Sequence, residues 1–426
     1  MPDYKKRKHN RLFSSPAKLK KSRIKTKSYS EDIKMTSSGK RKSASSSSNM
    51  KVVKGRKLEN KRKIKAGAVI TAGLLIAVLF LQFILPAGII EGISTVSAIV
   101  GTGGYPIELN GTETVNCVSR GSYYYVLSNT GIDAFNNSGK HIYSFTHGYE
   151  NPVLKVSACR AMIFEQGGTE ALVFDLKGLK TTITTEKSII TGAVSDSGRY
   201  ALVTLSDKYA SAVSVYDKND RTVYEWFSAE DTVNNVIISP NGKKIAVSVF
   251  NSTAGQFRSK LSILNFKSAT AEYTESYDNA LIYNLDSSFR NGFLIVTENG
   301  IKFVKWHKYK SSEYKNDYST AIFRTGKNGY VAVYNRESDK TDNRIAVFSK
   351  SGKLIAEFPY KGIVSDIAVS GNHIYCMSDT EISLLDSAGK VLRKGSCGFG
   401  AVRLIAESTN SVIVLTDNKI DKINLE

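Results

Sequence analysis

The segment SPNGKKIAVS, residues 239–248, places a tight turn directly before a short apolar strand. Asn241 and Gly242 are residue types that adopt the positive φ of a tight turn, and the following Ile245-Ala246-Val247 suits a buried strand. The same order of turn and short apolar run recurs along the chain after residue 100. Residues 195–198, 349–353 and 386–390 are further turns of this kind, so the segment belongs to a repeated unit.

The repeat has a period of about 40 residues. Its apolar runs begin near Tyr123, Ala161, Tyr200, Ile245, Phe293, Tyr330, Ile374 and Val412. Regular spacing in this range, with four short strands to a unit, is typical of β-propeller blades. We therefore predict an all-β fold, a propeller of about eight four-stranded blades over residues 105–426. The last repeat has only three strands, and residues 105–110 are predicted to supply the fourth and close the ring. Seven blades remain the alternative, because the unit 281–318 has a weak fourth strand.

The segment 239–248 resembles the repeat motif of TolB-type and WD-like β-propellers, with Asn241 where Asp is usual. The whole layout is similar to an uncharacterised family of Gram-positive bacterial membrane proteins, which have one membrane span and a propeller ectodomain. This resemblance implies the fold and the topology. It implies no activity, so no functional residue is carried over from it.

The charge of the chain is concentrated in its first 65 residues. The net charge of the whole chain is +20, with 59 Lys and Arg against 39 Asp and Glu. Residues 1–65 hold 23 of these bases and four of the acids, which leaves 36 bases and 35 acids in the remainder. The balance excludes a basic nucleic-acid-binding domain after residue 65. The serine-rich, basic segment 1–65 is predicted to be disordered, because it has few large apolar side chains to bury.

Residues 66–90 contain no charged side chain and directly follow the basic cluster 61–65. As a helix, 25 residues would extend about 37 Å, enough to cross a hydrocarbon core of about 30 Å. We predict an uncleaved signal anchor, because the apolar run is longer than that of a signal peptide and 65 residues precede it. The positive flank keeps the N-terminus in the cytoplasm. Residues 91–104 are then a linker, the propeller is extracytoplasmic, and the tail can also contact anionic lipid.

No catalytic or metal-binding pattern is recognisable. No two of the five histidines have the spacing of a zinc pair, and neither a nucleophile elbow nor a phosphate-binding loop is present. We therefore predict no catalytic residue, no cofactor and no metal. The enzyme alternative is an extracytoplasmic propeller that uses its central channel, similar to quinone-dependent dehydrogenases or active on glycans. In the quinone-dependent dehydrogenases many tryptophans hold neighbouring blades together, whereas this chain has only two tryptophans. The four cysteines are expected to be buried thiols, with a bridge between Cys376 and Cys397 left open.

The most specific expectation concerns two long connections between second and third strands. Residues 251–260 carry Phe257 and Arg258, and residues 335–343 carry Arg336 and Lys340, with Arg344 directly following. Because propellers usually bind partners through such connections, these five residues are our candidate binding residues. The predicted function is that of a membrane-anchored, non-catalytic binding or scaffold module for a protein or glycan of the cell envelope.

Overall fold

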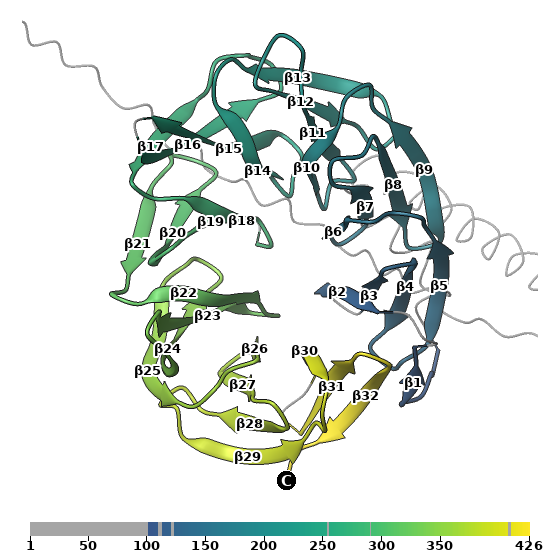
Figure 1. Cartoon of the computed structure of the whole chain (residues 1–426), viewed down its shortest axis with the longest axis vertical. Coiled ribbons are helices and arrows are strands. Elements are labelled where there is room, and N and C mark those ends of the chain that lie inside the picture. Colours follow the sequence, from purple (N-terminus) through teal and green to yellow (C-terminus); the bar gives the residue numbers. More distant parts are fainter. Residues whose placement is uncertain (1–100, 110–112, 121–122, 254, 290, 408–409) are drawn as a thin grey trace, which may run out of the picture. The chain divides into compact units, whose positions relative to one another are not determined.

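The computed structural model describes residues 101–426, except 110–112, 121–122, 254, 290, 408–409 and the side chain of Thr253. All regular elements in this part of the chain are strands, and they form eight antiparallel four-stranded sheets. The sheets are arranged around a central axis, with the first strand of each sheet innermost (Figure 1). The prediction of an eight-bladed propeller is confirmed, and the seven-bladed alternative is wrong. The segments 1–65 and 66–90 lie outside the described residues.

Seven blades are formed by consecutive strands. Blades 1 to 4 comprise β2 (Thr114–Arg120), β3 (Tyr123–Ser128), β4 (Gly131–Asn136), β5 (His141–Thr146); β6 (Pro152–Val156), β7 (Ala161–Glu165), β8 (Glu170–Asp175), β9 (Gly178–Thr184); β10 (Ile189–Val194), β11 (Tyr200–Thr204), β12 (Ser211–Tyr216), β13 (Thr222–Ser228); and β14 (Thr232–Ile238), β15 (Lys244–Thr253), β16 (Gln256–Asn265), β17 (Tyr273–Asp278). Blades 5 to 7 comprise β18 (Ile282–Asp286), β19 (Gly292–Thr297), β20 (Gly300–Lys305), β21 (Ser311–Lys315); β22 (Ser319–Thr325), β23 (Gly329–Arg336), β24 (Asp339–Ser349), β25 (Leu354–Lys361); and β26 (Asp366–Ser370), β27 (His373–Met377), β28 (Glu381–Leu385), β29 (Val391–Ser396). All eight second strands of the fold begin within one residue of their predicted positions.

Blade 8 joins the two ends of the described chain. It contains β30 (Ala401–Ala406), β31 (Ser411–Thr416) and β32 (Lys419–Asn424), and its outer strand is β1 (Ile107–Glu108). Ile107 pairs with Ile420, and the Leu109 amide donates to the carbonyl of Asn418 at 2.7 Å. The predicted closure by residues 105–110 is thus confirmed. Because β1 completes blade 8, every blade of the ring has a complete four-stranded blade on either side.

The core of the molecule lies between adjacent blades. One cluster joins Val213 and Val215 of blade 3 to Ile245 and Val247 of blade 4. An equivalent cluster joins Tyr124 of blade 1 to Leu415 of blade 8, so the closing contact is as well buried as the others. The consecutive tyrosines 123–125 are buried, so their rings are part of this core. Cys117, Cys159, Cys376 and Cys397 are free and buried.

The repeated turns explain the regular start of the strands. In the turn 239–243, the Gly242 amide donates to the Ser239 carbonyl at 2.7 Å, and Gly242 has φ +68°. A Cβ at this position would lie 2.3 Å from Ser197 Oγ of blade 3, so glycine also permits the close approach of two blades. The Asn241 and Ser239 side chains accept backbone hydrogen bonds within the same turn. Hence this sequence pattern marks the beginning of a second strand.

Candidate binding faces of the ring

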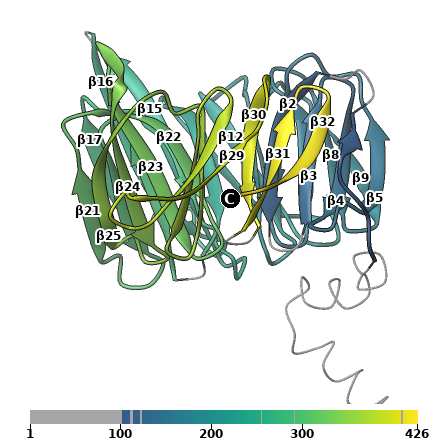
Figure 2. The ribbon, with the colours of Figure 1, turned by 90° about the horizontal axis from the view of Figure 1, so that it is seen from below.

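The propeller has two faces with different connections. Connections between first and second strands and between third and fourth strands lie on one face, which we call the turn face. Connections between second and third strands and between blades lie on the other, which we call the hairpin face. The β15–β16 hairpin projects from the hairpin face, and β1 runs up from the turn face, at the bottom of the view (Figure 2). The described chain therefore enters the ring at the turn face.

The predicted loop 251–260 is instead a continuation of β15 and β16. The two strands pair from Lys244↔Asn265 out to Thr253↔Gln256, so most of the predicted loop belongs to the two strands. The expectation of a loop was wrong here, because backbone pairing continues through residues that are mostly polar. Phe257 is 55% exposed near the tip of this hairpin. Arg258 forms an ion pair with Asp278 of β17 at 2.8 Å, and both side chains are exposed.

The second predicted loop, 335–343, is also a hairpin, since β23 ends at Arg336 and β24 begins at Asp339. The structure brings two of its predicted residues together around one ring. Arg336 lies over Tyr318 with 4.9 Å from the guanidinium carbon to the ring centroid, and Arg344 lies at 5.7 Å. Lys340 is exposed near the tip and is not part of this cluster. The site residues of the two hairpins remain predictions as binding residues.

Acidic groups complete the cluster at Tyr318. Asp342 accepts a hydrogen bond from the Tyr318 hydroxyl at 3.1 Å, and it pairs with Lys361 at 2.7 Å and with Arg336 at 3.3 Å. The hydrogen bond from Lys361 lowers the pKa of Asp342. A hollow of about 580 Å³ adjoins the cluster and is lined by residues 317–319 and 335–338. The blade 6 hairpin therefore presents charged groups in fixed positions.

The hairpin face also carries exposed aromatic side chains that the sequence analysis did not predict. Tyr209, in the connection after β11, and Phe227, near the end of β13, are both exposed, with ring centroids 5.0 Å apart. A hollow of about 220 Å³ beside them is lined by Trp226, Phe227, Ser228, Ala229, Glu230, Asp231, Val249 and Lys260. On the same face, Phe399 is 90% exposed in the connection before β30. The sequence signal was the pair Trp226-Phe227, since strand alternation directs one of two adjacent aromatic residues outward.

The two faces carry opposite charge. The described connections of the turn face hold 14 Lys and Arg against six Asp and Glu, a net charge of +8. The described connections of the hairpin face, together with 251–260 and 335–343, hold six bases against 13 acids, a net charge of −7. Composition did not reveal this separation, because the charges nearly cancel over the propeller as a whole.

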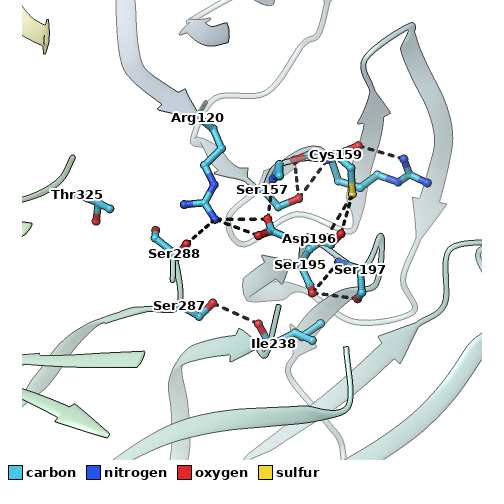
Figure 3. Close-up of polar contacts among 12 residues, drawn as sticks. Arg120, Ser157, Cys159, Ser195, Asp196, Ser197, Ile238, Ser287, Ser288 and Thr325 are labelled. Carbon is cyan, nitrogen blue, oxygen red and sulfur yellow. Dashed lines mark hydrogen bonds and ion pairs between the residues drawn. The ribbon is translucent and has the colours of Figure 1, made fainter. Parts of the chain in front are cut away.

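Arg120 joins distant blades of the ring at its turn-face end. It ends β2 in blade 1, and its Nη2 donates to both carboxylate oxygens of Asp196 in blade 3 at 3.4 Å. The same nitrogen donates to the Ser288 carbonyl of blade 5 at 3.2 Å (Figure 3). Asp196 also accepts from the Ala158 amide of blade 2 at 2.7 Å. Arg120 and Asp196 together thus link side chains and backbone from four blades.

A second charged group lies on the inner strands. Asp366 at the start of β26 is fully buried and pairs with Arg324 of β22 at 2.8 Å and with Arg403 of β30 at 3.6 Å. Its other oxygen accepts from the Leu404 amide at 2.9 Å. Burial lowers the pKa of Arg324. Asp366 therefore joins three adjacent blades near the axis.

Two buried cysteines have strongly raised pKa values. Burial raises the pKa of Cys117 and of Cys376 to about 12, which keeps both thiols protonated. In the described ranges, no group of three or more His, Cys, Asp and Glu could hold a metal ion. No helix in the described part of the chain is long and apolar enough to cross a membrane.

Comparisons with known proteins agree with the fold. BamB from Moraxella catarrhalis is similar, with a TM-score of 0.50 and 11% identity, over 76% of this chain and 97% of that one. The C-terminal WD40 domain of Sif2 is similar with the same TM-score and identity, over 76% of this chain and 100% of that one. At this identity the likeness shows the fold alone. No curated protein matches the sequence. Residues 104–425 match the model described as "Family of unknown function (DUF5711)", and the chain belongs to this family.

Proposed function

We propose that this protein is a membrane-tethered, non-catalytic binding module that presents its hairpin face to a partner in the cell envelope. The proposal rests on where the start of the described chain joins the ring. The Gly101 carbonyl accepts hydrogen bonds from Asn136 Nδ2 at 3.1 Å and from Ser138 Oγ at 2.8 Å, which fastens residue 101 to the turn face. The apolar segment 66–90 precedes this point, so a bilayer that holds it would lie on the turn-face side.

The hairpin face then points away from the bilayer, and its surface suits a partner. It carries the two projecting hairpins and the exposed aromatic residues Tyr209, Phe227 and Phe399. Exposed aromatic side chains supply much of the binding energy of protein interfaces, and their presence on a soluble surface indicates a binding site. A net charge of −7 on this face favours a protein with a basic surface over a neutral glycan.

Photocrosslinking in intact cells tests this proposal. A photoreactive amino acid is placed at Phe257 or Phe399 on the hairpin face, and at Glu225 in the outer strand β13 as an exposed control away from that face. We expect a discrete protein adduct from positions 257 and 399 and none from 225. A polydisperse adduct that a glycan hydrolase removes would identify a glycan partner instead. Adducts of equal yield from all three positions, or none from the hairpin face, would contradict the proposal.

A further inference from the structure

The turn face has a surface chemistry of its own. Its excess of bases includes exposed lysines on the connections between third and fourth strands of blades 2, 4, 5, 6 and 7, namely Lys177, Lys267, Lys308, Lys310, Lys353 and Lys390. Within the described residues, none of these six ammonium groups forms an ion pair. Unpaired ammonium groups on one face create a positive potential that attracts an anionic surface.

Exposed aliphatic side chains accompany these lysines. Leu179, Val223, Leu354, Ile355, Val391 and Leu392 are between 37% and 52% exposed. Each is the first or second residue of an outer strand, so it directly follows a connection of the turn face. The rim of this face thus alternates basic and aliphatic groups. Surfaces that lie in a membrane interface have this combination, with apolar side chains at the acyl boundary and lysines at the headgroups.

The tether brings this face within reach of lipid. Ten residues, 91–100, separate the apolar segment 66–90 from the residue that is fastened to the turn face. Fully extended, they would span at most about 36 Å. If residues 91–100 are less extended than this, the lysines of the turn face come within a Debye length of the headgroups, which is about 8 Å at physiological ionic strength.

We propose that the turn face rests on anionic phospholipid headgroups of the bilayer that holds the chain, which fixes the hairpin face outward. The inference rests on the membrane tether of the proposed function but not on any partner of the hairpin face. The turn face and its lysines supply the attraction, and the aliphatic rim supplies contact with the interface.

Energy transfer to headgroup-labelled lipid tests this inference on the full chain in nanodiscs. A donor dye is attached at Ser387→Cys on the turn face or at Ser338→Cys on the hairpin face; both serines are exposed, and the four native cysteines are buried. Discs of phosphatidylcholine alone are compared with discs containing an equal part of phosphatidylglycerol. We expect anionic discs to increase transfer from position 387 and not from 338. Raising the ionic strength from about 0.1 M to about 1 M should remove most of the gain, because the Debye length falls from about 10 Å to about 3 Å.

A matched pair of charge variants separates a lysine contact from a general charge effect. Replacing Lys308, Lys310, Lys353 and Lys390 by Gln should abolish the gain from anionic lipid. The same number of Lys→Gln changes at Lys187, Lys208, Lys340 and Lys361, which lie at or near the hairpin face, should leave it unchanged. Equal transfer in both lipid compositions would overturn the inference, as would a larger gain at position 338.

Two further outcomes have a definite meaning. Displacement of the turn face from anionic discs by soluble polyglycerol phosphate, with tighter binding to that polymer than to lipid, would assign the face to an anionic polymer and overturn the lipid contact. If the chain does not insert, co-sedimentation with neutral and anionic vesicles replaces the transfer measurement, and equal binding to both would overturn the inference. Neither result concerns the hairpin-face crosslinks, so the two proposals fail separately.

Discussion

Arg120 in blade 1 donates a hydrogen bond to the backbone carbonyl of Ser288 in blade 5 at 3.2 Å. These blades are opposite each other in a ring of eight, so one side chain spans the central channel. The same guanidinium contacts Asp196 of blade 3. Contacts between adjacent blades form the core of the ring, whereas this contact joins blades that share no core.

Replacing Arg120 by Ala should lower the free energy of unfolding by about 1–2 kcal/mol, because charge-assisted hydrogen bonds to partly buried groups are lost. Urea unfolding followed by tryptophan fluorescence measures the change. Arg258→Ala is the matched control, since its ion pair with Asp278 is exposed and should contribute less than about 1 kcal/mol. Equal effects of the two substitutions would show that the cross-channel contact does not stabilise the ring.

Asp366→Asn should have a larger effect. The substitution leaves Arg324 and Arg403 without their shared carboxylate near the axis. Breaking a buried pair of this kind costs about 3–5 kcal/mol. We expect a loss of this size in thermal or urea unfolding, and little change for Asp417→Asn in an exposed connection. A near-neutral Asp366→Asn variant would mean that the two arginines find other partners.

The Glu272 carboxylate should make the free energy of unfolding depend on pH in the acidic range. Its carboxylate accepts hydrogen bonds from Lys244 at 2.7 Å, from the Tyr309 hydroxyl and from Asn265 at 2.5 Å, and these bonds lower its pKa to about 2. The unfolded chain titrates near the ordinary value of about 4.3. The lowered pKa stabilises the fold above that value, and the contribution is lost as the pH falls towards 2.

The difference in unfolding free energy between the unmodified protein and Glu272→Gln should therefore be largest above about pH 5. It should shrink as the pH falls from about 4 to about 2. Unfolding free energies measured across this range test the expectation. Glu230→Gln, in an exposed connection, is the control and should show no such closing. A difference that stays constant down to pH 2 would contradict the assigned hydrogen bonds.

Ring closure depends on a very short strand. Leu109 follows β1 and is buried against Cys117, Tyr124, Ile413 and Leu415. Leu109→Ala should cost about 2–3 kcal/mol, within the range for buried leucines. Val115→Ala, 47% exposed on β2 of blade 1, should cost less than about 1 kcal/mol. Hydrogen exchange should show the loss first in β1 and β32. Uniform loss over all blades would argue that closure is not a local event.

The positions of the strands could be predicted from the sequence, whereas the arrangement of charged groups and hairpins on the surface of the propeller could not. Turns such as 239–243 combine Gly and Asn with an apolar run, and this local pattern precedes several of the second strands. The hairpins at 251–260 and 335–343 were missed because polar residues can continue a strand through backbone pairing alone, as Asn251 and Arg258 do. The cluster of Asp366, Arg324 and Arg403 joins three blades, and no local pattern contains that information. The charge separation of the faces became visible only when each connection was assigned to a face.

The most direct test of the account is the topology of the protein in intact cells. An epitope is placed after the exposed Glu426 in one variant and before Met1 in another, and an external protease is added. The account predicts that the C-terminal epitope is cleaved in intact cells, whereas the N-terminal one is cleaved only after lysis. Protection of the C-terminal epitope until cells are broken would place the propeller in the cytoplasm and contradict the account.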